Sequence, residues 1–194
     1  FLDQLIARLK INSSEKKAIS PEKVIFYIYA ILHSPGYRTR YIEFLKTNFP
    51  NIPTTSILEL FYKLSEFGSC LVALHTMEST AQNKHPTVPI GTGEFRVEKI
   101  TYSDEIVWIN RAKTVGFEGI PEEVWGFHVG GYQVCQKWLK DRGPKKGQPG
   151  RILTKEDIRH YQMIVFAISE TIRIMAEIDE VIEEHGGWPG AFVT

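Results

Sequence analysis

The apolar positions in the first part of the chain recur with the period of an α-helix. A continuous apolar run over residues 24–32 follows Ser20-Pro21, a pair typical of a helix start, since serine caps free amides and proline needs no amide at the first helical position. We therefore expect a buried helix over residues 21–33. Ser34-Pro35 repeats the pair and predicts a second helix to about residue 46, which gives a helix-turn-helix corner.

The segment that follows contains two prolines within residues 49–53 and predicts an extended connector that carries Asn51. Ser56 and Glu59 have the spacing of a capping box and predict the start of a third helix that runs to about residue 77. The prolines and the capping spacing together predict a rigid connector with a helix on either side.

The pattern changes after residues 78–92, which are polar, contain prolines and glycines and predict a loop. Residues 94–102 and 105–110 are rich in β-branched and aromatic side chains and flank a short polar turn. This pattern predicts a β-hairpin, with a third strand over residues 114–118.

The last part of the chain returns to helical spacing. Residues 121–125 predict a single helical turn, and residues 132–140 predict a short amphipathic helix that is entered through Gly130-Gly131. Thr154 is placed to cap a long helix. Apolar residues of that helix keep heptad spacing, which favours packing in the core of the chain over an intermolecular coiled coil: Ile158, Tyr161, Val165, Ile168, Ile172, Met175 and Ile182.

Together these elements predict an α+β, helix-dominated fold: a helical lobe with a long C-terminal helix, joined to a small antiparallel β-hairpin or sheet. We expect one domain over residues 1–194. Within it, residues 1–78 would form the helical lobe, residues 93–130 a β-rich insert and residues 131–187 a helical return.

The composition is that of a globular protein with balanced charge. The chain has 194 residues, of which 43% are hydrophobic, and it carries 23 basic and 23 acidic residues, so binding to nucleic acid would require local basic patches. No apolar run reaches the roughly 20 residues that cross a bilayer. Cys70 and Cys135 lie in helical segments and suggest reduced, buried thiols in a cytoplasmic protein. The start at Phe1, without a signal-peptide pattern, leads us to expect an excised fragment.

Basic residues concentrate in two places. Residues 137–151 hold six basic residues and one acidic residue, a net charge of +5, in a flexible stretch with glycines that suits contacts to phosphates. A smaller group consists of Arg38, Arg40 and Lys46. In both places the alternative interpretation is a charged surface that is simply solvated.

Motifs of catalysis are missing from the sequence. It has no glycine-rich cofactor loop with an Asn/Asp-Pro-Pro-Tyr/Phe motif, no phosphate-binding loop of nucleotide hydrolases and no Cys/His pair at zinc spacing. The string Glu15-Lys16-Lys17 lacks the acidic partner of a nuclease site. The acidic end of the long helix indicates a solvated face: Glu177, Asp179, Glu180, Glu183 and Glu184. We expect no catalytic residue, no metal ligand and no cofactor in this chain.

Three long segments resemble a known family in the same order. They are IFYIYAILHSPGYRTRYIEFLKTNFPNIP at residues 25–53, PEEVWGFHVGGYQVCQKWLKDR within residues 117–142, and DIRHYQMIVFAISETIRIMAEID at residues 157–179. They are similar to the C-terminal specificity domain, or target-recognition domain, of type ISP restriction-modification enzymes and related fused adenine-specific DNA methyltransferase-nucleases.

The resemblance implies a domain that reads double-stranded DNA inside a bacterial, cytoplasmic enzyme. Its partner would be the methyltransferase domain of the same polypeptide, which uses S-adenosylmethionine; a nuclease and sometimes a helicase-like motor would complete the parent. Family members commonly carry arginine where this chain has Asn51. If the position contacts a phosphate, the amide removes a charge-assisted contact; if it faces a base, the amide could favour adenine over guanine.

Eleven residues follow as candidates for contact with DNA. Those expected at phosphates are Arg38, Arg40, Lys46, Lys140, Arg142, Lys145, Lys146 and Arg151. Those expected at bases or sugars are Tyr37, Asn51 and Gln133. The alternative function is a helical protein-interaction or oligomerisation module of the same enzyme. An enzymatic role for the chain itself would need a carboxylate cluster that the sequence does not show.

Overall fold

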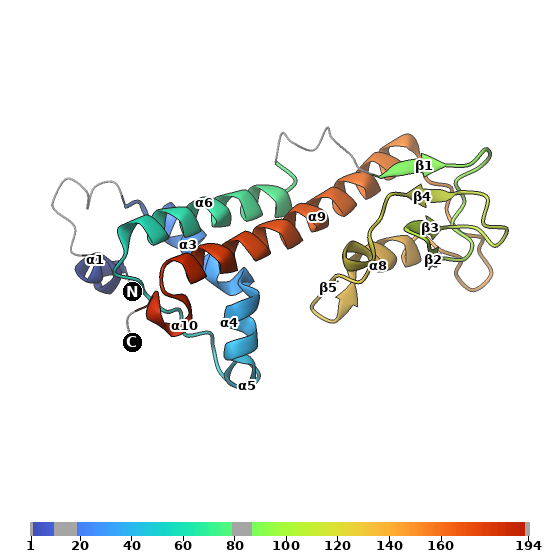
Figure 1. Cartoon of the computed structure of the whole chain (residues 1–194). Helices are drawn as coiled ribbons and strands as arrows, with labels where there is room; N and C mark the ends of the chain where they lie inside the picture. The colour runs from blue at the N-terminus through green and yellow to red at the C-terminus, as the bar shows by residue number, and fades with distance from the viewer. Residues whose placement is uncertain (1, 10–18, 79–86, 193–194) are drawn as a thin grey trace. The chain divides into compact units, whose positions relative to one another are not determined.

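The chain forms two compact units, drawn in Figure 1. The computed structural model describes residues 2–9, 19–78 and 87–192. We call residues 1–79 with 171–194 the helical unit, and residues 80–170 the mixed unit. One helix, α9 (Lys155–Glu184), contributes its first part to the mixed unit and its last part to the helical unit. The helix-dominated α+β fold expected from the sequence is confirmed.

Short and long helices build the helical unit. Besides the end of α9, they are α1 (Leu2–Arg8), α3 (Pro21–His33), α4 (Pro35–Arg40), α5 (Ile42–Leu45), α6 (Leu58–His75) and α10 (Gly187–Gly190). The predicted start of α3 is confirmed, because the Ser20 side chain accepts a hydrogen bond from the Lys23 amide. Ser34 likewise accepts from the Tyr37 amide and starts α4. The predicted second helix is interrupted at Tyr41, whose backbone leaves the helical region (φ −107°, ψ 17°).

Close packing of α3 against α6 forms the centre of the helical unit. Gly68 of α6 lies so near α3 that a Cβ atom there would stand 1.8 Å from the carbonyl oxygen of Phe26. The rings of Tyr27 and Phe61 pack with centroids 5.4 Å apart. Fully buried side chains on both helices complete this core: Tyr27, Ile31, Leu60, Phe61, Leu64 and Leu71.

The prediction of a capping box formed by Ser56 and Glu59 is wrong. Helix α6 begins at Leu58, and no side chain caps it. Thr55 is buried instead; its hydroxyl accepts a hydrogen bond from the Ile57 amide (3.0 Å) and donates to the carbonyl of Ala191 (2.9 Å). The tie to the C-terminal end of the chain fixes Thr55, so the helix starts later than local sequence rules indicate.

Asp179 also departs from the expectation of a solvated acidic face. Its carboxylate accepts hydrogen bonds from the Ser34 hydroxyl and from the Gly36 amide, the latter at 2.8 Å. Ser34 is fully buried. Asp179 therefore fastens α9 to the corner between α3 and α4.

A four-stranded antiparallel sheet forms one layer of the mixed unit, with the strand order β1-β4-β3-β2. Its strands are β1 (Val88–Ile90), β2 (Thr101–Ser103), β3 (Ile106–Trp108) and β4 (Gly116–Glu118). The predicted hairpin is confirmed as β2 and β3, which turn at Asp104 and Glu105 with φ 54° and 57°. The predicted third strand is β4, whereas β1 lies in a segment expected to be loop.

A second hairpin replaces the helix entry expected at Gly130-Gly131. Strands β5 (His128–Val129) and β6 (Tyr132–Gln133) pair antiparallel around the two glycines, whose φ angles are 56° and 84°. Both angles lie in the left-handed region, which a two-residue turn of type I′ requires. The expected helix over residues 132–140 is consequently shorter, since α8 spans Val134–Lys140.

Helices α7 (Glu122–Trp125) and α8, the sheet and the start of α9 enclose the core of the mixed unit. The helical turn predicted near residues 121–125 is confirmed as α7. Phe117 of β4 packs on Tyr161 of α9 with ring centroids 4.6 Å apart, and Trp138 of α8 lies 5.3 Å from the same tyrosine. Cys135 is buried as expected, and burial raises the pKa of its thiol to about 12.

Two predictions about helix surfaces have different outcomes. Cys70 is exposed rather than buried, because the buried face of α6 is made by other residues, among them Leu64 and Leu71. The heptad stripe of α9 is used inside the chain, as expected, with Tyr161, Val165, Ile168 and Ile182 buried. Among the described residues, no helix is long and apolar enough to cross a membrane.

Candidate nucleic-acid interface

The basic segment, residues 137–151, begins on α8 and continues into a loop whose main chain is hydrogen-bonded. Lys145 and Gln148 exchange two backbone hydrogen bonds, of 3.1 and 2.9 Å. The amide of Arg151 donates to the carbonyl of Arg142 (2.8 Å) and closes the base of the loop. The stretch that the sequence suggests to be flexible is therefore a shaped loop.

Gly150 lies against the neighbouring segment of the same chain, around Val97, and fixes the loop there. A Cβ atom at this position would lie 1.6 Å from the carbonyl oxygen of Val97, so no other residue fits without a shift of the backbone. The Val97 amide donates to the carbonyl of Arg151 (3.0 Å), and Arg96 donates through Nη1 to the carbonyl of Gly150 (3.0 Å). These contacts hold the basic side chains of the loop in a defined arrangement.

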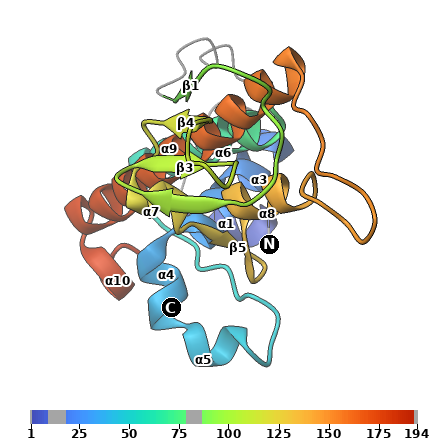
Figure 2. The same cartoon turned by 90° about the vertical axis from the view of Figure 1, so that its right-hand side faces the viewer.

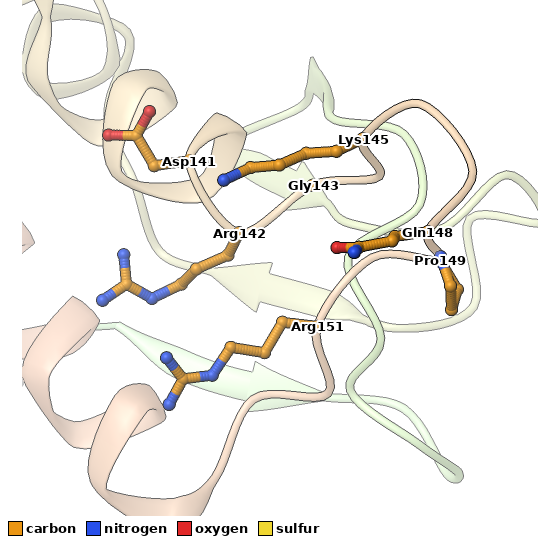
Figure 3. A pocket seen from close by; sticks show the side chains of 7 residues that line it. All are labelled: Asp141, Arg142, Gly143, Lys145, Gln148, Pro149 and Arg151. Carbon is orange, nitrogen blue, oxygen red and sulfur yellow. The ribbon is translucent and has the colours of Figure 1, made fainter.

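An open pocket of about 350 Å³ lies within the loop, as Figure 3 shows. The side chains of Arg142 and Arg151 extend side by side in the same direction, while that of Lys145 extends toward α8. Three cationic residues and one acidic residue line it, together with neutral ones: Asp141, Arg142, Gly143, Lys145, Gln148, Pro149 and Arg151. A pocket with this charge attracts anions.

Asp157, in the first turn of α9, forms ion pairs with both arginines. Arg151 donates through Nη2 to its carboxylate (2.9 Å), and Nε of Arg142 lies 3.6 Å from it. Burial alone raises the pKa of Asp157, but hydrogen bonds from the amide and hydroxyl of Thr154 and the charges of both arginines outweigh burial and lower it. The Arg142 guanidinium also lies over the ring of Trp138, 3.5 Å from its centroid.

Lysines supply the unpaired charge of the basic segment. Lys137 forms an ion pair with Asp141 at 2.5 Å. Lys140, Lys145 and Lys146 are exposed, and the described part of the chain offers their ammonium groups no ion pair or hydrogen bond. Contacts from these three lysines to phosphates would break no ion pair or hydrogen bond among the described residues.

The candidates of the helical unit are more dispersed. Arg38 donates from Nε to the carbonyl of Leu32 (2.6 Å), and Lys46 is paired with Glu43 at 2.7 Å on the surface. Arg40 is exposed at the end of α4. This group presents positive charge on α4 and on the chain after α5.

The three candidates for contact with bases differ in what they present. Tyr37 is buried, and its hydroxyl donates to the carbonyl of Asn51 (2.9 Å). The side chain of Asn51 is on an exposed residue of the connector, whose backbone this hydrogen bond fixes. Gln133 uses its amide nitrogen to donate to the carbonyl of Trp125. Tyr37 and Gln133 thus stabilise the protein locally, and contact of any of the three with DNA stays a prediction.

The structure brings Arg142, Lys145 and Arg151 together around one pocket, with Lys140 and Lys146 on the same segment. Tyr37, Arg38, Arg40, Lys46 and Asn51 lie in the other unit. Sequence reasoning missed the β5–β6 hairpin, although a Gly-Gly pair between Val129 and Tyr132 is a hairpin signal.

The described ranges contain no cluster of side chains of the kind that holds a metal ion. No three His, Cys, Asp or Glu side chains between residues 19–78 or 87–192, or in residues 2–9, are placed to hold a metal ion. The string Glu15-Lys16-Lys17 lies outside the described residues.

The model of one protein family, the Type ISP C-terminal specificity domain, matches residues 1–177. The match covers most of the 194 residues. The chain therefore belongs to the family of Type ISP C-terminal specificity domains, as the resemblance of its three segments indicates. No curated protein sequence matches it.

Three solved structures share the fold. The nuclease-deletion mutant of the Type ISP restriction-modification enzyme LlaGI in complex with a DNA substrate mimic is 20% identical over 82% of this chain, with a TM-score of 0.61. The ATP-dependent Type ISP restriction-modification enzyme LlaBIII bound to DNA is 18% identical over 91%, with a TM-score of 0.63. The DrdV–DNA complex is 21% identical over 91%, with a TM-score of 0.67. The chain spans only 14%, 12% and 19% of these three proteins.

Proposed function

We propose that this chain recognises a DNA sequence on behalf of a restriction-modification enzyme. The observation that carries the proposal is its membership of the specificity-domain family, which spans nearly the whole chain. The basic segment supports it, because three exposed lysines and two fixed arginines form the local positive surface that a protein of zero net charge needs for DNA.

The parent would be a larger cytoplasmic polypeptide, as the short coverage of the three DNA-bound relatives suggests. In it, an adenine-specific methyltransferase domain using S-adenosylmethionine and a nuclease would carry out the chemistry. This chain would supply neither catalytic groups nor a cofactor site; its partners would be double-stranded DNA and the methyltransferase domain.

Phosphate contacts and base contacts would have separate roles. Lys140, Lys145 and Lys146 would approach the DNA backbone and fix the register, which contributes affinity without sequence information. Arg142 and Arg151 would shape the pocket while they remain paired with Asp157. Because the net charge is zero, attraction would act at short range, and the rest of the enzyme would contribute to affinity.

Neutralising Lys145 and Lys146 tests this proposal. In the full-length enzyme, Lys145→Gln with Lys146→Gln should weaken binding to all DNA sequences alike and lower the slope of log affinity against log salt by about 2, roughly 0.9 for each lost phosphate contact. The measurement is a titration of labelled duplex at several salt concentrations.

The matched control removes two other exposed lysines of the mixed unit, through Lys99→Gln with Lys113→Gln. That variant should retain the salt slope of the unmodified enzyme. An unchanged slope in the Lys145/Lys146 variant would contradict the assignment of the basic segment to phosphates.

A further inference from the structure

The β5–β6 hairpin is a small projecting element of the mixed unit. Its turn is formed by Gly130 and Gly131, and a Cβ atom on either glycine would meet no atom within 4 Å. Figure 1 and Figure 2 both show this turn at the free end of a narrow loop. The tip therefore stands clear of the residues described around it.

Apolar side chains flank the tip and are exposed. Val129 is 59% exposed and Tyr132 is 62% exposed. The two residues are directly paired across the hairpin, so their side chains lie on the same face. An exposed valine and tyrosine paired on a projecting element form the kind of surface that binds a partner.

The hairpin is held firmly at its base. Two-residue strands alone are unstable in water. Here the Gln133 side chain donates to the carbonyl of Trp125, and the Val134 amide donates to the carbonyl of Phe127 (3.3 Å). The indole of Trp125 stacks on Tyr102 at 5.2 Å, with an interplanar angle of 11°. These contacts order the tip before any partner binds, which lowers the entropic cost of binding.

The basic segment adjoins the exposed face and indicates the chemistry of its partner. The Lys137 ammonium, which is paired with Asp141, lies 5.8 Å from the centre of the Tyr132 ring. The basic segment starts at that lysine, so the chain runs from the hairpin through α8 directly into the anion-attracting pocket. An apolar tip next to a stretch that carries +5 fits DNA, whose phosphates surround base edges that offer apolar methyl groups.

His128 lies on the opposite face of the hairpin from Val129, because neighbouring residues of a strand point to opposite sides. It is exposed, and its Nδ1 atom lies 2.6 Å from the carbonyl oxygen of Gly126. A carbonyl can only accept, so Nδ1 donates this hydrogen bond.

We propose that the β5–β6 hairpin enters the major groove and reads base pairs there. This inference rests on the proposed function and names the element that gives it sequence selectivity. Val129 and Tyr132, on one face of the hairpin, contact the apolar edge of a base, such as the methyl group of thymine. The major groove, about 12 Å wide, admits a two-stranded β-ribbon.

The test uses the full-length enzyme with Val129→Ser and Tyr132→Ser together. Affinity is measured for the duplex that contains the mapped recognition sequence and for duplexes in which each of its base pairs is replaced in turn. In the unmodified enzyme each replacement should weaken binding roughly 5- to 100-fold. The double variant should lose this penalty at one run of adjacent base pairs and retain it at the others.

Two further variants make the result decisive. Val88→Ser changes a valine on β1 of the same unit that is 54% exposed, and it should retain every penalty. Val129→Ser alone should reduce the penalty at the same run of base pairs, so a folding defect of the double variant cannot decide the outcome. If all penalties persist in both hairpin variants, the inference is overturned. This holds also if those variants are found to have lost a contact with another protein, because the hairpin would then bind protein and not bases.

The failure of this inference differs from the failure of the proposed function. If exchange of the whole domain alters the recognised sequence while the hairpin variants retain every penalty, the domain recognises DNA through other elements. If exchange of the whole domain leaves the recognised sequence unchanged, both proposals fail.

Discussion

At the scale of single residues, Asp157 joins local helix formation to the geometry of the basic pocket. The amide of Asp157 donates to the Thr154 hydroxyl (3.1 Å), and its carboxylate accepts from the amide and hydroxyl of the same threonine. The carboxylate also pairs with Arg142 and Arg151. The start of α9 and the direction of two arginines therefore depend on one buried acid.

Replacing this acid by Asp157→Asn should lower the free energy of unfolding by about 3 kcal/mol at neutral pH, because it leaves a partly buried guanidinium without its counter-charge. The pKa of Asp157 is lower in the folded than in the unfolded protein, so its stabilisation is present above the unfolded value of about 3.9 and is lost as the pH falls below it. Urea unfolding of both proteins between neutral and acidic pH measures this. The difference in free energy of unfolding between the unmodified protein and the variant should become smaller as the pH falls. A difference that does not change with pH would count against the ion pairs.

Asn51 is the residue whose change most directly tests a base or phosphate contact in the helical unit. Within the part of the chain that the structure describes, only the backbone of Asn51 is engaged, by the hydroxyl of Tyr37, so Asn51→Arg should change the free energy of unfolding by no more than about 0.5 kcal/mol. We expect it to change the sequence that the full-length enzyme methylates, since asparagine prefers adenine and arginine prefers guanine. An unchanged sequence with a steeper salt slope would assign the position to phosphate instead.

At the scale of elements, close approach of α3 and α6 depends on the missing side chain of Gly68. Gly68→Ala should destabilise the chain by about 1–3 kcal/mol or more, because the new methyl group would overlap the carbonyl of Phe26 and force the helices apart. Ser69→Ala, at the next position of α6, is the control and should cost less. Urea unfolding of the two variants compares them, and equal stability would contradict this packing.

Elements that rest on local signals are predictable from the sequence, as α3 shows. Ser20 and Pro21 define its start, and both signals act within one turn. The start of α6 could not be predicted in the same way, because the contact that fixes Thr55 comes from Ala191, far along the chain. The β5–β6 hairpin was missed since Gly130-Gly131 also suits a helix entry, and only strand pairing distinguishes the two.

The positive charge of the candidate site could be predicted from the sequence, but which of its basic residues form ion pairs could not. A run of basic residues over 137–151 is visible in the sequence. Which of them are neutralised depends on side-chain positions: Arg142 and Arg151 share Asp157, whereas Lys145 and Lys146 have no ion-pair partner within the described residues. Sequence reasoning treated these residues as equivalent, and the structure separates them.

At the scale of the whole molecule, a chain without net charge carries its positive surface in one ordered segment next to a projecting hairpin. The family to which it belongs is defined by sequence specificity. We therefore infer that the lysines of the basic segment supply affinity and that exposed side chains such as Val129 supply selectivity. These two contributions should respond differently to salt, because only phosphate contacts release counterions.

Exchange of the domain tests the central claim most directly. Residues 1–177, the part that matches the family model, would be replaced in the full-length enzyme by the corresponding region of a relative that methylates a different sequence. Methylated sites would then be mapped across genomic DNA by single-molecule sequencing. The hybrid should methylate the sequence of the relative; a hybrid that remains active and still methylates the original sequence would contradict the assignment of sequence recognition to this domain.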